Sequence, residues 1–399
     1  MSDLSNGLRG TAVKVAGIKD IARALGVSIG TVDRALHGRP GINPMTRSRV
    51  LKMAQTLGYR PNFAARHLKL NKRLRISVHL PREIALFFDV LRAGILEAAG
   101  PFQSTIDVQF RSYPRLGEGD IELFEEALSD DTNGIILTPG HPAALKPWIR
   151  KAARKRIPVV CVATDAPGTE RLTSISGDPY TSGAMVAELL TRCVRLSGPV
   201  LLVTGDLSTN DHAEKVRGFQ DSLAGMQSPL ELARIVEAHD NPDEAYQKTR
   251  EFLSGHPDLR AVYVSTANSI PVLRALDESG GLGRIVVMTT DLFPALVPLI
   301  RNGRVLGTLY QRPRAQGRMA FQALYKFLVE GTCPQVRHRL PPHIILRSNL
   351  ELFLEMLPGD LEEAVSPLEK PETKSGRRPA RGHESRETVA TTGSGGELR

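Results

Sequence analysis

The chain has 399 residues, of which 41% are hydrophobic and 24% are charged, a composition typical of a soluble globular protein with more than one domain. It contains no apolar run of ~18 residues, so a membrane span is not expected, and its first residues lack the apolar stretch of a signal peptide. Its three cysteines are widely spaced, which argues against a disulfide framework or a metal site and predicts reduced thiols in a cytoplasmic protein.

The positive charge of the chain is concentrated near its N-terminus. Residues 1–75 hold 15 Lys and Arg against three Asp, whereas the whole chain has a net charge of +9, so the remainder is slightly acidic. This asymmetry is typical of a protein that binds nucleic acid through one basic domain. A solvated basic face is less favoured, because the charges alternate with helix-periodic apolar residues.

Two short helices separated by a tight turn are predicted between Ile18 and Leu36. Apolar residues recur at helical spacing in the first helix, and Gly26 permits the positive φ angle at which a helix can end. Ser28 is a good N-cap for the second helix, in which Val32, Ala35 and Leu36 face inward. This helix-turn-helix pattern is typical of DNA-binding heads, although an ordinary helical hairpin is the alternative. The residues left on the outer face are Ile29, Gly30, Thr31, Asp33 and Arg34.

The rest of the N-terminal region divides into short segments. Residues 1–16 carry no periodic pattern and are expected to form a flexible leader, and a helix from Pro44 to Leu57 completes a helix-turn-helix domain over 17–61. Its expected apolar face consists of Val50, Leu51, Ala54 and Leu57.

The basic segment 62–74 is expected to hold a two-turn helix that is too short to persist alone, followed by a linker. Two interpretations stay open for this segment. It is either a hinge whose Leu68 wedges between base steps in the minor groove, or a plain interdomain linker.

Strands and helices alternate from residue 75 onward. The strands are apolar and β-branched, which is typical of parallel sheets covered by helices, and their number favours two doubly wound lobes. The strands are predicted at 75–80, 106–113, 134–139, 158–165, 199–206, 232–240, 261–267, 284–291 and 305–311. The helices are predicted at 86–99, 119–129, 142–155, 180–196, 213–225, 242–254, 269–279, 293–302 and 314–330.

The N-terminal residues resemble the head of the lactose/galactose-repressor (LacI/GalR) family of bacterial transcription regulators. The matching stretches are IKDIARALGVS, TV-x-R-x-L at 31–36, TRSRVLKMAQTLGYRPN at 46–62 and AARHL at 64–68. The resemblance implies that Ile29, Gly30 and Arg34 face bases and that Thr31 and His37 lie near the DNA backbone. The expected hinge contacts are Asn62, Ala65 and Leu68, and Lys19 and Ser28 complete the DNA-binding set.

Two residues of the second helix depart from the family pattern. Asp33 stands where the family usually has Ser, and Gly30 offers no side chain at a base-reading position. Arg34 is therefore expected to carry more of the direct readout, because a bidentate contact between Arg and guanine is worth roughly 1–3 kcal/mol of discrimination.

The body resembles the periplasmic-binding-protein type I domain of the same family. The predicted fold class is therefore α/β, with a small all-α helix-turn-helix head followed by a two-lobed doubly wound body over 75–357. Three crossings between lobes are expected near Ser174–Asp178, Gly303–Leu306 and Arg339–Pro342. They assign about 75–175 and 305–338 to lobe 1, and about 176–303 and 340–357 to lobe 2.

The ligand of such a fold is expected beyond the carboxyl ends of the strands, between the lobes. Carboxylates, an amide and aromatic faces suit a polyhydroxy ligand. Asp291 and Gln311 match sugar-binding positions of the family, whereas the ligand Arg usually stands several residues before Arg217, where this chain has Ala213. The candidate ligand-binding residues are Phe87, Phe88, Asp89, His141, Asp165, Arg217, Asn268, Asp291 and Gln311.

These patterns predict a transcription regulator, most simply a repressor, that binds a pseudo-palindromic operator as a homodimer under the control of a sugar or sugar alcohol. Neither catalytic motifs nor cofactor or metal motifs are found: the chain has no G-x-S-x-G, Walker loop or H-E-x-x-H. An activator or a co-repressor-dependent regulator with a non-sugar effector stays open. A pure solute-binding protein is disfavoured by the basic head. The tail, 358–399, is rich in Pro, Gly, Ser and charge and is expected to be disordered.

Overall fold

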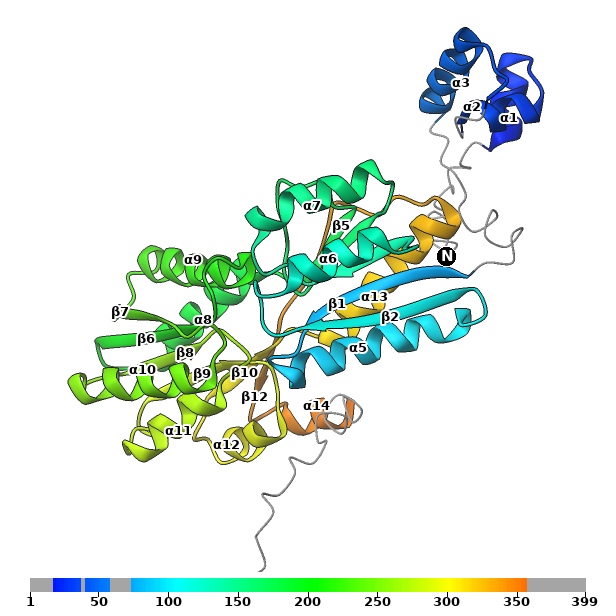
Figure 1. Ribbon diagram of the computed structural model, residues 1–399. Helices are drawn as coiled ribbons and strands as arrows, with labels where there is room; N and C mark the ends of the chain where they lie inside the picture. The colour runs from blue at the N-terminus through cyan, green and yellow to red at the C-terminus, as the bar shows by residue number, and fades with distance from the viewer. Residues whose placement is uncertain (1–16, 37–39, 58–72, 357–399) are drawn as a thin grey trace, which may run out of the picture. The chain divides into compact units, whose positions relative to one another are not determined.

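The computed structural model describes residues 17–36, 40–57 and 73–356 (Figure 1). The expected leader, His37, the hinge residues Asn62, Ala65 and Leu68, and the C-terminal tail lie outside these residues. No helix of the described ranges is both long and apolar enough to cross a membrane.

The head consists of helices α1 (Ile18–Leu25), α2 (Ile29–Leu36) and α3 (Pro44–Thr56). Gly26 ends α1 with φ of 65°, a left-handed conformation that glycine adopts without strain. The Ser28 hydroxyl then accepts a hydrogen bond from the Thr31 amide at 3.1 Å and so caps α2. A small apolar core holds the three helices together and contains Ile21, Ala22, Val32, Ala35, Val50 and Ala54.

Helix α3 uses a narrower apolar face than its sequence suggested. Val50 and Ala54, one helical turn apart, are buried, whereas Leu51 and Leu57 are 44% and 37% exposed. The i, i+4 pair is sufficient to cover the small surface that α1 and α2 offer. The other two expected positions therefore lie outside the head core.

The first lobe is built on a six-stranded sheet of order β11-β5-β4-β3-β1-β2, and all its paired strands are parallel. Helices α5 and α13 pack together beside one face, and α6 and α7 pack together beside the other. The strands are β1 (Leu74–Pro81), β2 (Ile106–Tyr113), β3 (Gly134–Leu137), β4 (Val159–Val162), β5 (Thr173–Gly177) and β11 (Arg337–Leu340). The helices are α5 (Ala85–Ala99), η1 (Gly100–Phe102), α6 (Asp120–Ser129), α7 (Pro142–Arg154), α13 (Pro313–Tyr325) and the π-helical turn η3 (Lys326–Glu330).

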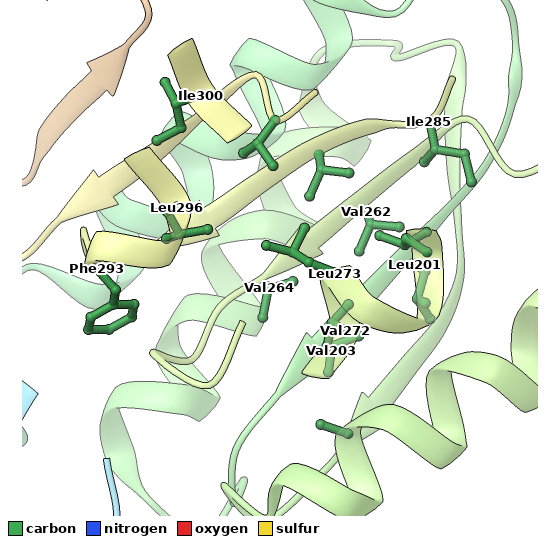
Figure 2. Packing of buried hydrophobic residues seen from close by; sticks show 14 of the residues in the cluster. Leu201, Val203, Val262, Val264, Val272, Leu273, Ile285, Phe293, Leu296 and Ile300 are labelled. Atoms are coloured by element: carbon green, nitrogen blue, oxygen red, sulfur yellow. The ribbon is translucent and has the colours of Figure 1, made fainter. Parts of the chain in front are cut away.

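The second lobe repeats this plan with a sheet of order β12-β10-β9-β8-β6-β7, in which only the β10–β12 pair of the described strands is antiparallel. Figure 2 shows part of its core, where side chains of β6 and β8 meet those of α11. The strands are β6 (Gly198–Thr204), β7 (Leu230–Glu237), β8 (Ala261–Val264), β9 (Val286–Thr290), β10 (Gly307–Tyr310) and β12 (His343–Leu346). The helices are α8 (Pro179–Cys193), α9 (Asn210–Gly225), α10 (Pro242–Gly255), α11 (Ile270–Glu278), η2 (Pro294–Leu296), α12 (Val297–Arg301) and α14 (Leu350–Met356).

The two-lobed, doubly wound fold class predicted for the body is confirmed, with one change in chain assignment. Strand β10 pairs with β9 and β12 in the second sheet, so the crossing expected near Gly303–Leu306 lies after β10, before α13. The short strands β5, β11 and β12 were not predicted. They flank the other two crossings, which lie between Gly177 and Pro179 and between Leu340 and His343.

Helix α9 is held very close to α8. A Cβ atom on Gly183 would lie 1.9 Å from the Lys215 carbonyl oxygen, and one on Gly218 would lie 2.0 Å from the Tyr180 carbonyl oxygen. The two backbones touch because neither glycine has a side chain. This contact sets the position and rotation of α9, whose first turns carry the side chains described below.

Candidate functional site

The outer face of α2 is the candidate DNA-reading surface of the head. Ile29 is 50% exposed, and Gly30 and Arg34 are also exposed. The Arg34 Nε atom donates to the Gly30 carbonyl oxygen at 3.2 Å, which orients the guanidinium along the helix. Thr31, bonded to the Ser28 hydroxyl, is half-buried. Lys19 on α1 is exposed as well. The face therefore combines an apolar side chain, hydroxyls and cations, the groups that contact base edges and phosphates.

The second candidate site is a cavity of about 40 Å³ between the two lobes, at the carboxyl ends of their strands. Aromatic rings and aliphatic side chains form its apolar part, and polar groups of both lobes complete it. Lobe 1 contributes Ile84, Phe87, Phe88, Leu116, Thr138, Ala163 and Thr164, and the second sheet and its helices contribute Thr209, Asp211, His212, Lys215, Thr266, Ala267 and Gln311.

The backbone around this cavity adopts an unusual conformation at several strand ends. Six of the eight described non-glycine residues with positive φ follow strands here. Such residues cost on the order of 1–3 kcal/mol each and concentrate at functional sites, where the surrounding structure holds them. They are Ile84 after β1, Ala163 after β4, His239 and Asp240 after β7, Asp291 after β9 and Arg312 after β10.

A buried polar chain connects the cavity to the start of the second crossing. The Lys215 ammonium lies 2.7 Å from the Asp211 carboxylate and donates to Gln311 Oε1 at 2.9 Å. Gln311 in turn donates to Asp291 from its amide and from Nε2, at 3.1 and 2.7 Å. Burial raises the pKa of Asp291 to about 6, despite the lowering effect of these bonds from Gln311. By accepting these two hydrogen bonds, Asp291 holds the Gln311 side chain in the orientation that contacts Lys215.

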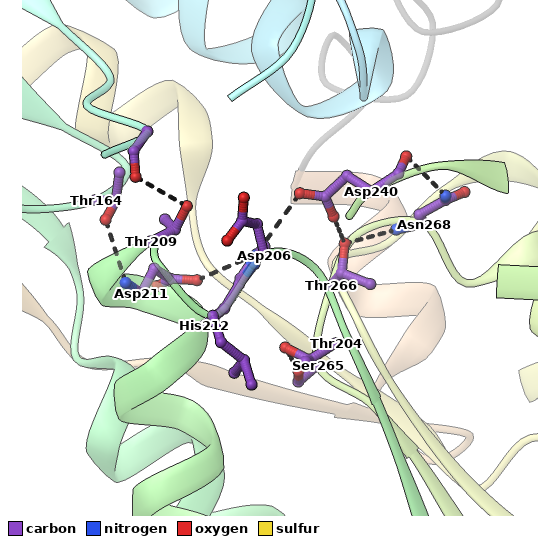
Figure 3. A network of polar contacts seen from close by, with 12 residues as sticks. Thr164, Thr204, Asp206, Thr209, Asp211, His212, Asp240, Ser265, Thr266 and Asn268 are labelled. Carbon is purple, nitrogen blue, oxygen red and sulfur yellow. Dashed lines mark hydrogen bonds and ion pairs between the residues drawn. The ribbon is translucent and has the colours of Figure 1, made fainter. Parts of the chain in front are cut away.

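Three hydrogen bonds join the lobes beside the cavity. The Thr209 hydroxyl donates to the Gly140 carbonyl oxygen at 3.1 Å, and the Asp211 amide donates to the Thr164 hydroxyl at 3.2 Å (Figure 3). His141 Nε2 lies 3.2 Å from the Asp206 carboxylate. Partial burial raises the pKa of Asp206, but hydrogen bonds from Ser208 and His141 outweigh it and hold the pKa below its usual value. Asp206 therefore carries its charge at neutral pH and can hold His141 across the gap.

The structure brings four of the predicted ligand-binding residues to the cavity or directly behind it. Phe87, Phe88 and Gln311 line it, and Asp291 supports Gln311. The two phenyl rings lie edge to face, with centroids 5.0 Å apart. They present an apolar wall of the kind that packs against the C–H face of a sugar ring.

The other five predicted residues do not line the cavity. Asp89 is exposed beside Arg92, and Arg217 is exposed and bound to Glu214 at 2.6 Å. Asp165 is buried in a bidentate pair with Arg171. His141 bridges the lobes to one side, as described above. Asn268 donates to the Asp240 carbonyl oxygen at 3.0 Å, within the polar network of Figure 3.

The ligand-binding residues expected from the sequence include none of Asp211, His212 and Lys215, which line the cavity. The cause is the start of α9, which lies at Asn210 and not at residue 213 as predicted. From the observed start, the three residues fall on one face of the helix, and Arg217 falls on another. The spacing D-H-x-x-K was the available signal, because i and i+4 positions share a helix face.

Two family models match the chain. The periplasmic binding protein domain matches residues 79–332, and the bacterial regulatory proteins of the lacI family match residues 17–62. Catabolite control protein A of Priestia megaterium is 26% identical over 332 residues, which cover 81% of this chain and 97% of that protein. The HTH-type transcriptional regulator AglR of Rhizobium meliloti (strain 1021) is 25% identical over 325 residues, which cover 80% and 90%.

Solved structures share the fold of the body. GanP, a glucose-galactose binding protein from Geobacillus stearothermophilus, matches with a TM-score of 0.65 at 23% identity, covering 70% of this chain and 99% of GanP. The family models thus cover the head and the body in turn, in the same order as the two domains of the structure. The chain therefore belongs to the lacI family of bacterial regulatory proteins, DNA-binding transcription regulators, and carries a periplasmic-binding-protein domain behind its helix-turn-helix head.

Proposed function

We propose that this regulator is a repressor whose operator affinity is controlled by a small polyhydroxy compound, a sugar or sugar alcohol, bound between the lobes. The observation that carries this proposal is the cavity whose wall comes from both lobes, with Phe87 and Phe88 on one side and Lys215 and Gln311 on the other. The described sugar-binding role of GanP, which shares the fold, agrees with this ligand class.

The size of the cavity supports coupling between ligand and conformation. At about 40 Å³ it has room for about three water molecules, which is less than a hexose needs. A sugar therefore binds only if the lobes separate or the lining side chains reorient. A compound that contacts both lobes changes their equilibrium, provided that its affinity differs between the two arrangements.

The position of Gln311 supports transmission toward the rest of the molecule. It follows β10 of the second sheet and precedes α13, which packs with α5 of the first lobe. The Gln316 side chain also donates to the Gln311 carbonyl oxygen at 2.8 Å. A ligand that moves Gln311 would thus act on the segment that joins the lobes.

A homodimer on a pseudo-palindromic operator is part of the proposal. One α2 helix offers few base contacts, and two heads related by a two-fold axis double them on a symmetric site. The hinge interpretation of segment 62–74 belongs to the same proposal.

The proposal is tested by measuring operator binding with and without effector. An operator is selected from random double-stranded DNA with the full-length protein, and fluorescence anisotropy gives its Kd in the presence of monosaccharides, sugar alcohols and inositols. We expect one compound to weaken operator binding at least tenfold. Gln311→Ala should abolish this response without changing the affinity for operator in the absence of effector.

The head provides the matched control. Arg34→Ala should weaken operator binding about tenfold or more, since a bidentate base contact is worth roughly 1–3 kcal/mol. Thermal stabilisation by the effector should be unchanged in this variant. A compound that tightens operator binding would instead identify a co-repressor, and transcription that rises with operator occupancy would identify an activator. If no compound of the panel alters Kd, the polyhydroxy ligand class is rejected.

A further inference from the structure

Several buried polar atoms around the inter-lobe cavity lack a hydrogen-bond partner within the described residues. They are Asp211 Oδ1, His212 Nδ1, Asp240 Oδ2 and Thr138 Oγ1. Each of these four residues is less than 9% exposed. Asp211, His212 and Thr138 line the cavity, and the Asp240 carboxylate lies 4.0 Å from His212 Nε2 (Figure 3). Unpaired buried polar atoms are costly, so these positions favour a ligand that completes their hydrogen bonds.

The unpaired atoms are mostly acceptors. A carboxylate oxygen only accepts hydrogen bonds, so Asp211 and Asp240 require donors from the ligand. The other Asp240 oxygen already accepts from the Thr266 hydroxyl. Hydroxyl groups supply such donors, whereas a phosphate dianion or a carboxylate supplies none.

The charged residues that line the cavity also favour an uncharged ligand over an anion. Lys215 is the one Lys or Arg among the residues that line the cavity, and its ammonium is engaged by Asp211 and Gln311. No Lys or Arg of the described residues pairs with Asp240 within 4.0 Å, and the basic group at that distance is the His212 ring. A negatively charged ligand group in this buried space would therefore be repelled by the carboxylates, because the cation of the wall is already paired.

The N-terminus of α9, which could otherwise attract an anion, is also occupied. Asp211 places its own carboxylate in the first turn, and the Asp211 amide donates to Thr164. The positive end of the helix dipole is thus already balanced from within. Phe87 and Phe88 close the opposite wall with apolar rings and add no donor for a phosphate.

We infer that this cavity selects an uncharged, hydroxyl-rich effector and rejects the same compound when it carries a phosphate or carboxylate group. The inference rests on the proposed function and sharpens it. Asp240 and Asp211 are its specificity-determining residues: Asp240 repels the anion directly, and Asp211 engages the one cation that could bind it.

Matched pairs of compounds test this selectivity. Isothermal titration of the full-length protein at pH 8 compares D-glucose with glucose 6-phosphate and gluconate, D-ribose with ribose 5-phosphate, sorbitol with sorbitol 6-phosphate, and myo-inositol with its monophosphate. For the pair that binds, we expect the neutral member to bind at least tenfold more tightly. Asp240→Asn should reduce this ratio at least threefold. Asp211→Asn, which releases Lys215, should increase the affinity for the phosphorylated member.

The control is Asp258→Asn, which removes an exposed carboxylate from the loop before β8 and should leave the ratio unchanged. Circular dichroism confirms that each variant is folded. A phosphorylated compound that binds as tightly as its neutral parent, or more tightly, overturns the inference and leaves the proposed polyhydroxy effector standing. If no member of any pair binds the folded wild-type protein, both the inference and the proposed ligand class are rejected.

Discussion

Asp291 illustrates how one buried residue links the cavity to the stability of the fold. Its carboxylate accepts two hydrogen bonds from Gln311, yet it is only 2% exposed, and burial raises its pKa from 3.8 to about 6. The folded state therefore binds a proton at Asp291 more tightly than the unfolded chain does. The stability that this contributes is fully present below the unfolded pKa, and it is lost as the pH rises through the folded pKa.

Asp291→Asn should remove this pH dependence. Between pH 4 and pH 7, the free energy of unfolding of the wild type should fall relative to that of the variant by on the order of 2 kcal/mol. Urea unfolding at both pH values measures this difference. The same series on Asp258→Asn, an exposed carboxylate, should show no such change. A constant difference between wild type and Asp291→Asn would contradict the assignment of this proton to Asp291.

At the scale of elements, the crossing of α8 and α9 decides which side chains reach the cavity. The crossing depends on two glycines, Gly183 and Gly218, that let the helix backbones touch. Any larger residue separates the helices or rotates α9. Rotation of α9 moves Asp211 and Lys215 together, because they lie one turn apart on the same face.

Gly218→Ala is therefore expected to destabilise the protein by about 1–3 kcal/mol, the usual cost of overpacking a close contact. Effector affinity should fall as well, because Lys215 is displaced from Gln311. Thermal unfolding and isothermal titration measure the two effects. Gly225→Ala is the matched control in the same helix: a Cβ atom there meets nothing within 4 Å, so its effect should stay within about 1 kcal/mol or be stabilising.

At the scale of the whole molecule, the contacts between the lobes would determine the response to the proposed effector. Few polar contacts between the lobes lie within the described residues. In one of them, the His141 and Asp206 side chains are 42% and 22% exposed to solvent. Such a pair contributes about 0.5 kcal/mol, enough to bias an equilibrium between lobe arrangements without locking it. Two cysteines of the body can carry dyes that report the distance between the lobes, because Cys193 and Cys333 are exposed whereas Cys161 is buried.

Single-molecule energy transfer between dyes on Cys193 of α8 and Cys333, which precedes β11 of the first sheet, should reveal two populations. The effector should shift them toward one, because it contacts both lobes. His141→Ala removes a bond that holds the effector-free arrangement, whose cavity is too small for a sugar. It should therefore shift the effector-free distribution toward the effector-bound population and strengthen effector binding about two- to threefold. A single population that neither the effector nor His141→Ala alters would exclude lobe movement as the response.

The identity of most elements and the family followed from local signals. Continuous apolar, β-branched runs marked the longer strands, and Gly26 and Ser28 marked the turn of the head, because helix ends and caps depend on residues a few positions apart. Two buried strands of either lobe look alike in sequence, however. The pattern around β10 indicated a strand without indicating its partners, which lie in the second sheet.

The cavity required long-range information. Gln311 was found because it directly follows β10, and Phe87 and Phe88 were found because they lie in the first turn of α5, the helix that follows β1, where the fold places ligands. Lys215 and Asp211 lie on α9. Whether their side chains reach the cavity depends on where α9 begins and on how closely Gly183 and Gly218 let it pack against α8. Composition and periodicity therefore determine the class of the protein and its elements, whereas the pairing of strands and the rotation of one packed helix decide which side chains line the cavity.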